Sequence, residues 1–161
     1  MKDNRKFIVD ENLILRAAAV LSTASYATYD AATPKTIDLG GDGYTEGKLI
    51  IDVTTAATNW ATVASGSVAD FSLRGSNSAT TFDDAYVTLA RFRLGTKFAA
   101  ESLKDAGHGG ASQATASVAS RYIVPWTNDF GGTCYRYLRL RIQFGGTGAT
   151  GPTLGMLFLT K

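Results

Sequence analysis

The chain has 161 residues, a formal net charge of +2 that results from 16 basic and 14 acidic side chains, and a single cysteine. This length is typical of one domain that buries enough apolar surface to fold without a disulfide or a structural metal. The near balance of charge argues against nucleic acid as the main partner. The sequence contains no run of about 18 apolar residues, so we expect no membrane-spanning helix.

The N-terminal segment carries apolar residues that charged residues interrupt. Phe7, Ile8 and Leu13 stand on either side of Asp10. Two interpretations stay open: an ordinary first strand of the core, or an arm formed by residues 1–21 that packs on a partner. Such an arm can become ordered on a partner surface, because burying its apolar side chains offsets the entropy that it loses.

Four segments between residues 35 and 94 alternate between apolar and polar side chains, which is the pattern of half-buried strands. They cover residues 35–39, 48–53, 69–74 and 86–94. In the last of them, the alternation predicts that Ala90, Phe92 and Leu94 are buried and that Arg91 and Arg93 are solvated. Glycine-rich turns close the first and third segments.

The second half of the chain adds further strands and long loops. Residues 105–117 are rich in Gly, Ala and Ser and predict a long flexible loop. Residues 121–126 predict a strand. Pro125 indicates that this strand lies at the edge of a sheet or ends there, because proline cannot donate a ladder hydrogen bond. The glycine-rich residues 145–152 predict a hairpin connection to a final strand at residues 153–160.

The strongest strand signal lies near the C-terminus. From Leu138 to Phe144, apolar residues alternate strictly with Arg139, Arg141 and Gln143. The alternation predicts one buried face and one polar face. The arginines then lie on an outward face, either as a solvated surface or as a charged contact surface for a partner.

About eight strands without a strong helix signal predict an all-β fold for residues 1–161, with long loops rich in Gly, Ala and Ser. Two packed antiparallel sheets bury such alternating strands. Eight strands in two sheets are typical of a jelly-roll β-sandwich. An immunoglobulin-like sandwich is the alternative, although the chain lacks the Cys, Trp and Cys spacing of that fold.

Candidate chemical sites are few. Residues 146–151 match the G-x-G-x-x-G pattern of dinucleotide-binding loops, but Pro152 and a short strand follow where that fold needs a helix. His108 is the single histidine, and one His with one Cys cannot supply a closed zinc site. A Ser-His-Asp triad is arithmetically possible, but it needs a rigid, packed histidine, whereas His108 stands among glycines. Cys134 cannot form an internal disulfide, and a free thiol is compatible with assembly in a reducing cytosol. We therefore expect no catalytic, cofactor-binding or metal-binding residues, and a protein that is not an enzyme.

Several motifs occur in an order that is typical of a known family. They are Ile37-Asp38-Leu39-Gly40, Lys48-Leu49-Ile50-Ile51-Asp52-Val53, Phe71-Ser72-Leu73-Arg74-Gly75-Ser76, Ser76-Asn77-Ser78, Phe82-Asp83-Asp84-Ala85 and Arg136-Tyr137-Leu138-Arg139-Leu140. With them the chain resembles, over residues 36–161, the small jelly-roll cement or decoration proteins of tailed phages, of the Bordetella-phage cement type. The motif that begins at Arg136 is the closest match.

The resemblance implies a structural virion protein without a catalytic site or a cofactor. Such proteins attach to the outer surface of an icosahedral shell after assembly in the host cytoplasm, and they clamp neighbouring copies of the major capsid protein together. They often act as homodimers or homotrimers, and neither nucleic acid nor a membrane is expected as a partner. The alternative function is a carbohydrate-binding jelly-roll module, in which aromatic side chains form a platform for sugars. The candidates for this platform are Trp60, Trp126, Tyr135 and Tyr137.

Two sets of residues are candidates for protein contacts. The expected capsid contacts are Phe7, Ile8, Leu13, Arg139 and Arg141. The final strand is apolar on both faces, so it is either fully buried or covered by another chain. The expected self-contact residues are therefore Leu154, Met156, Leu157, Phe158 and Leu159.

Overall fold

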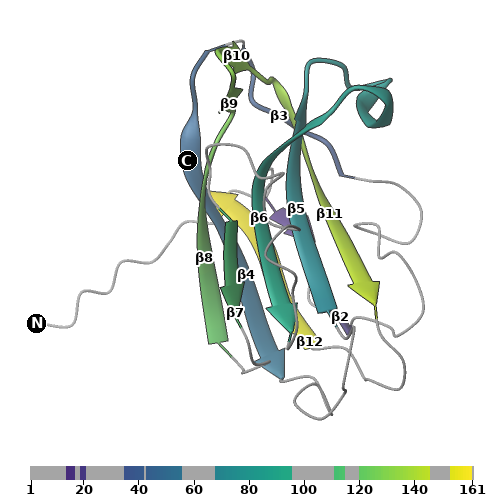
Figure 1. Cartoon of the computed structure of the whole chain (residues 1–161), viewed down its shortest axis with the longest axis vertical. Coiled ribbons are helices and arrows are strands. Elements are labelled where there is room, and N and C mark those ends of the chain that lie inside the picture. Colours follow the sequence, from purple (N-terminus) through teal and green to yellow (C-terminus); the bar gives the residue numbers. More distant parts are fainter. Residues whose placement is uncertain are drawn as a thin grey trace, which may run out of the picture.

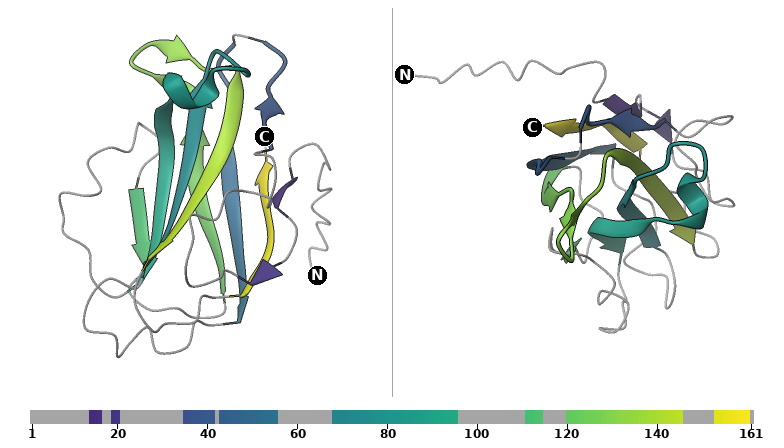
Figure 2. Two further views of the ribbon diagram at one scale, coloured as in Figure 1. Left: turned by 90° about the vertical axis from the view of Figure 1, so that its right-hand side faces the viewer. Right: turned by 90° about the horizontal axis from the view of Figure 1, so that it is seen from above.

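The computed structural model describes residues 14–16, 19–20, 35–41, 43–55, 68–95, 111–114, 120–145 and 153–160. In this part of the chain nearly all regular structure is β-strand, and the long strands form two sheets that pack face to face (Figures 1 and 2). The predicted all-β sandwich is thus confirmed. A single turn of 3-10 helix, η2 (Phe82–Asp84), follows the fifth strand.

The first sheet has the strand order β1-β12-β4-β8, and β2 also pairs with β12. Its strands are β1 (Ile14–Arg16), β2 (Ala19–Val20), β4 (Glu46–Thr55), β8 (Ser120–Thr127) and β12 (Thr153–Thr160). β8 ends the described strand order and continues past Pro125 to Thr127. Of the two alternatives for Pro125, the edge position is therefore the one that is confirmed.

The second sheet has the strand order β3-β11-β5-β6-β7. Its strands are β3 (Ile37–Asp38), β5 (Val68–Ser76), β6 (Val87–Gly95), β7 (Ala111–Ala114) and β11 (Tyr137–Gly145). A small hairpin of β9 (Asp129–Phe130) and β10 (Thr133–Cys134) lies at the end of the molecule where β3 lies (Figure 1).

The strands pair in a nested scheme. β5 pairs with β6, and around this innermost pair follow β4 with β8, β3 with β11, and finally β1 with β12, all antiparallel. The chain is therefore wound like one long hairpin whose successive strand pairs alternate between the two sheets. Pairing of β12 with β4 and of β11 with β5 completes each sheet.

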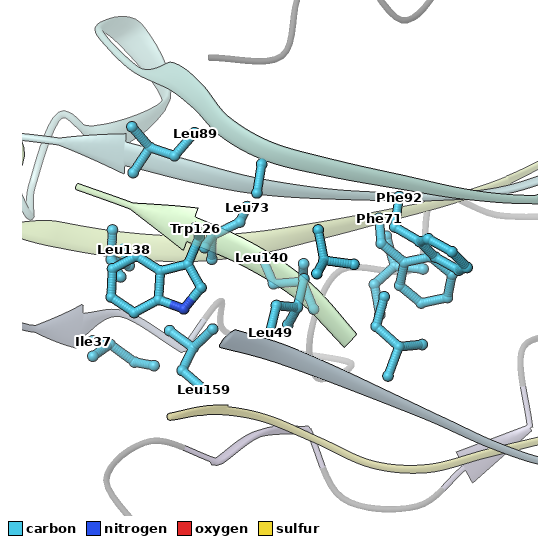
Figure 3. Packing of buried hydrophobic residues seen from close by; sticks show 14 of the residues in the cluster. Ile37, Leu49, Phe71, Leu73, Leu89, Phe92, Trp126, Leu138, Leu140 and Leu159 are labelled. Atoms are coloured by element: carbon cyan, nitrogen blue, oxygen red, sulfur yellow. The ribbon is translucent and has the colours of Figure 1, made fainter. Parts of the chain in front are cut away.

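The space between the sheets is filled by the apolar faces of the alternating strands. Leu138, Leu140 and Ile142 are buried, as the strict alternation predicts. Trp126 of β8 is buried in the same layer, and Figure 3 shows its ring among Ile37, Leu138 and Leu159. Other members of this core come from β4, β5 and β6. They include Leu49, Ile51, Val53, Ala69, Phe71, Leu73, Leu89, Ala90 and Phe92.

A β-bulge in β6 places two consecutive residues in the core. Leu73 of β5 lies opposite Ala90, whereas the next residue, Arg74, lies opposite Thr88, so Leu89 is the extra residue. Leu89 and Ala90 are both fully buried. Simple alternation predicts the burial of Ala90 and misses that of Leu89, because the bulge changes the phase of the strand.

Two predicted connections were wrong. Residues 145–152 do not connect a hairpin, because β11 and β12 belong to different sheets. Within the expected loop of residues 105–117, Ala111–Ala114 forms β7, which pairs in parallel with β6. Its small residues carry no alternation, so the backbone pairing with β6 alone defines this strand.

Asn128, directly after β8, connects three segments from inside the fold. Its side-chain Oδ1 accepts a hydrogen bond from Thr45 N at 2.7 Å, and its Nδ2 donates to the carbonyl oxygens of Gly43 and Tyr135. Its backbone pairs with Thr45 and Tyr135 as well. The Asn128 side chain is fully buried, so its own amide oxygen and nitrogen depend on these partners for their hydrogen bonds.

We predict that Asn128→Ala lowers the free energy of unfolding by about 2 kcal/mol, because it removes three side-chain hydrogen bonds, made by a fully buried amide, that connect β8 with two other segments. Chemical denaturation followed by circular dichroism measures this loss. The control is Asn77→Ala, which removes an exposed hydrogen bond to Arg136 N and should have a smaller effect. Equal losses in the two variants would contradict the role assigned to Asn128.

Gly47 allows the C-terminal end of β12 to approach β4 closely. A Cβ atom at this position would lie 1.8 Å from the carbonyl oxygen of Thr160 and 3.1 Å from the Trp126 ring. We predict that Gly47→Ala destabilises the protein by about 1–3 kcal/mol, because a strand of the sheet has to move. The measurement is the thermal midpoint of unfolding. Gly41→Ala is the matched control, since a Cβ atom there meets nothing within 4 Å. If Gly41→Ala lowered the thermal midpoint as much as Gly47→Ala does, this explanation would be refuted.

Candidate partner-contact face

The outer face of the second sheet is rich in arginine. We call it the arginine face. It consists of Asp70, Ser72, Arg74, Arg91, Arg93, Arg139 and Arg141. Core residues alternate with these positions on β5, β6 and β11, so the arginines of three neighbouring strands come to lie side by side. Arg139 lies directly opposite Arg74, and Arg141 lies opposite Ser72, which in turn lies opposite Arg91.

Asp70 is the central carboxylate of this face. Arg91 Nε donates to its Oδ1 at 2.9 Å, and Arg93 Nε donates to its Oδ2 at 2.8 Å. Ser72 Oγ also donates to Oδ1. Asp70 and Arg93 are only 6% and 8% exposed, so the prediction that Arg93 is solvated was wrong. Arg91 is partly buried, with 17% of its side chain exposed, so it is less solvated than predicted. The physical reason is that a carboxylate on the neighbouring strand pairs with both guanidinium groups, which removes the main penalty of burying them.

Arg139, an expected capsid contact, is held within the chain. Its Nε donates to Thr36 Oγ1 at 2.8 Å, its Nη2 donates to the carbonyl of Ala79 at 3.0 Å, and its Nη1 lies 3.2 Å from Asp83 Oδ2. Its guanidinium also lies over the ring of Phe82 at 4.5 Å. Arg139 therefore fixes η2 and the preceding turn against the sheet, while its contact with a capsid stays a prediction.

Arg74 is in a different environment from its cross-strand neighbour Arg139. Its guanidinium lies over the ring of Tyr86, 3.8 Å from the ring centroid, and its Nε is buried without a hydrogen-bond partner. Burial lowers the pKa of Arg74 from its ordinary value, and the positive charge of Arg141 lowers it further. Tyr86, and after it the carboxylates of Asp83 and Asp70, raise the pKa of Arg74 and so act in the opposite direction. The sequence gives no sign of this difference, because the alternation treats Arg74 and Arg139 alike.

Directly before β11, Arg136 forms an exposed ion pair with Asp38. The pair joins two of the motifs on which the family resemblance is based. Arg136 donates to Asp38 through Nε at 2.7 Å and through Nη2 at 2.8 Å. The hydrogen bond from Arg136 and a second one from the backbone N–H of Gly40 lower the pKa of Asp38 from 3.8 to about 2. Arg136 N in turn donates to Asn77 Oδ1, which ties the turn after β5 to the same end of the sheet.

We predict that Arg136→Gln raises the pKa of Asp38 towards its ordinary value of 3.8, because the largest cause of the shift is removed. The folded-state pKa is depressed, so the stability that this pair contributes is present above about pH 4 and is lost as the pH falls towards 2. A carbon-detected NMR titration of the Asp38 carboxyl group measures the shift. Arg121→Gln, in the other sheet, is the control and should leave the titration unchanged. An unaltered Asp38 pKa in Arg136→Gln would contradict the assignment.

The other predicted contact residues are placed differently. Phe7, Ile8 and Leu13 lie outside the described residues. The expected self-contact residues Leu154, Met156, Leu157, Phe158 and Leu159 all belong to β12, which lies inside the first sheet between β4 on one side and β1 and β2 on the other. The Leu159 side chain is buried in the core of its own chain. The strand thus has partners at both edges, and whether its remaining side chains contact another copy stays a prediction.

The aromatic residues considered for a sugar platform do not gather on the described surface. Trp126 is buried in the core, and Tyr135 packs against that core. Tyr137 has the guanidinium of Arg136 at 5.2 Å from its ring centroid. Trp60 lies outside the described residues. A platform for sugars therefore cannot include the Trp126 ring in this conformation.

Residues with metal-binding or membrane chemistry were searched within the described ranges. No group of three or more His, Cys, Asp and Glu residues is placed there so that it can hold a metal ion. No described helix has the length and apolar character needed to cross a membrane. Cys134 is a free, partly exposed cysteine in β10, and His108 lies outside the described residues.

No protein-family model matches the chain. No curated protein matches it either. A functional interpretation therefore depends on the motifs of the sequence and on the geometry described above.

Proposed function

We propose that the chain is a structural protein of jelly-roll type that binds the outer surface of a tailed-phage capsid and reinforces it. The observation that carries the proposal is that the motifs of the resemblance meet in space. Those in β3, β11 and β5 lie on three adjacent strands of one sheet. Asp38 and Arg136, from the first and the last of the motifs in the sequence, form an ion pair. The motifs in β3, β11 and β5 thus form one connected piece of structure, whereas the motif of residues 48–53 belongs to β4 of the first sheet.

The nested strand pairing supports the jelly-roll part of the proposal. A jelly roll has eight strands in two sheets with Greek-key connections. Eight strands of this chain can be matched to that scheme if β1 and β2 are counted as one: β1 with β2, β3, β4, β5, β6, β8, β11 and β12. The first of these strands then pairs with the last, the second with the seventh, the third with the sixth and the fourth with the fifth. An immunoglobulin-like sandwich does not require this scheme.

A rigid sandwich of this kind suits a protein that clamps others. Most charged groups on its second sheet are bound to each other or to turns, so the surface keeps a fixed shape. A capsid offers many identical copies of the major capsid protein, and a homodimer or homotrimer multiplies modest contacts into strong attachment. The partner is therefore the major capsid protein, and the location is the outer capsid surface of the virion.

The N-terminal segment gives a direct test. Removing residues 1–12 deletes Phe7 and Ile8 but keeps β1, which begins at Ile14 and pairs with β12. We predict that the shortened chain stays folded and binds capsid shells of the encoding phage at least tenfold more weakly, a loss of about 1.4 kcal/mol. Co-sedimentation with purified shells measures the affinity.

The matched control lacks residues 1–6 only and should bind like the full chain. Full-strength binding of the chain without residues 1–12 would show that this segment is not a capsid contact. Failure of the full chain to bind shells, together with its retention on a glycan array, would favour the carbohydrate-binding alternative over the capsid proposal.

A further inference from the structure

The strand β8 has an open edge within the part of the chain that the structure describes. It runs from Ser120 to Thr127 at one margin of the first sheet, and β4 is its pairing partner there (Figure 1). The other strands at the ends of the two sheets, β1, β2, β3 and β7, have two to four residues each. β12, the strand expected to contact another copy, already has partners at both edges. Among the long described strands, β8 is therefore the one that can still add a neighbour.

The hydrogen-bond pattern with β4 determines which residues of β8 point their backbone groups to this open edge. The backbone N–H of Asn128 donates to the carbonyl of Thr45, one step beyond the end of the strand pair. In an antiparallel pair, residues that bond to the neighbouring strand alternate with residues that point away from it. Counted back from Asn128, the residues Arg121, Ile123 and Pro125 point away from β4. A proline at one of these positions agrees with the count, since its nitrogen has no hydrogen to donate to β4.

These outward positions are accessible to another chain. Arg121, Ile123 and Pro125 are all exposed, and Ile123 is 54% exposed in the middle of the strand. Ile123 lies directly opposite Ile50 of β4, which is buried although its two neighbours in the sequence, and not Ile50 itself, belong to the core. The two isoleucines form an apolar row on the outer face of the first sheet, and this row stops at the open edge.

We propose that β8 pairs antiparallel with β8 of a second copy about a two-fold axis at Ile123, so that the first sheets of two chains join into one continuous sheet. The inference names the contact between copies, and it rests on the proposed function for the expectation that copies associate. The two Ile123 residues exchange both backbone hydrogen bonds, and the N–H of Arg121 donates to the carbonyl of Pro125 in the other copy. Addition of a strand to an open sheet edge is a recurring mode of protein recognition.

The side chains of the outer face select this register. Directly opposite residues of an antiparallel pair lie about 5 Å apart on the same face, so an axis at Ile123 continues the apolar row through both copies. An axis at Tyr122 would place Ile123 against Arg121. An axis at Val124 would place it against Pro125, whose own neighbour on β4 is charged. Of these three axes, only the one at Ile123 gives each exposed isoleucine an identical apolar partner.

Arg121 and Pro125 do not prevent this pairing, although charged residues and prolines often protect sheet edges. Arg121 lies 3.5 Å from Asp52 of its own chain and faces the neutral Pro125 of the second copy. Pro125 lacks a donor but keeps its carbonyl acceptor. Parallel pairing in the same register would instead place Arg121 opposite Arg121, which is unfavourable. The two residues therefore favour the antiparallel contact, and a two-fold contact closes on itself as a dimer without forming fibres.

Single cysteines test the geometry in the full chain, with Cys134→Ser as the background that removes the one native thiol. Paired residues at the axis have Cα atoms about 5.5 Å apart, which a disulfide can span. Ile123→Cys should therefore form a covalent dimer under mild oxidation. Arg121→Cys should not, because roughly 14 Å separates the two copies of that position. A mixture of Arg121→Cys and Pro125→Cys should form mixed dimers, since these positions face each other.

Analytical ultracentrifugation measures the association without a cross-link. The unmodified chain should sediment as a dimer at about 100 μM, and Ile123→Arg should raise the dissociation constant of the dimer at least tenfold. Tyr44→Arg is the matched control, because Tyr44 is also exposed, at 60%, but does not belong to β8. This variant should sediment like the unmodified chain, and circular dichroism checks that both variants keep the β-fold.

A monomeric or trimeric full chain at this concentration would overturn the inference. So would a dimer in which Ile123→Cys forms no cross-link, or a dimer that Tyr44→Arg weakens as much as Ile123→Arg does.

These measurements do not depend on capsids. A chain that attaches to shells as a monomer would refute the β8 contact and leave the capsid proposal in place. A dimer that is cross-linked through Ile123→Cys, while the unmodified chain does not attach to shells, would refute the capsid proposal alone.

Discussion

The apolar layer between the two sheets is the constraint on which the rest of the structure depends. A β-strand alternates its side chains, so each residue that the layer takes from one strand sends its neighbours to the outer face. With Leu140 inside, Arg139 and Arg141 have to point outwards, and with Leu73 inside, so does Arg74. The crowding of arginines on one face is therefore a consequence of the core, and their charge has to be balanced on that face.

The sequence predicts well what depends on neighbouring residues and poorly what depends on distant ones. Alternation was sufficient for the buried face of β4, β5 and β11, and one proline indicated the edge position of β8 as one of two alternatives. The burial of Arg93 could not be predicted, because its partner Asp70 comes from another strand, 23 residues away in the sequence. The bulge at Leu89 and the passage from β11 to the other sheet also depend on tertiary pairing, which local patterns do not contain.

The same distinction applies to the candidate contact residues. Arg139 and Arg141 were found because they alternate with core residues, but alternation cannot tell which arginine is already bound within the chain. Arg139 was expected at a partner contact, yet its donors are used by Thr36, Ala79 and Asp83. Arg74 was part of a motif and received no role. Its environment distinguishes it from Arg139: the Tyr86 ring lies against its guanidinium, and its Nε has no hydrogen-bond partner.

Arg74 and Arg139 lie directly opposite each other, so the sheet gives their backbones equivalent positions. Their difference arises from the turn after β5. This turn brings the carbonyl of Ala79 and the carboxylate of Asp83 to Arg139, whereas it brings the Tyr86 ring to Arg74.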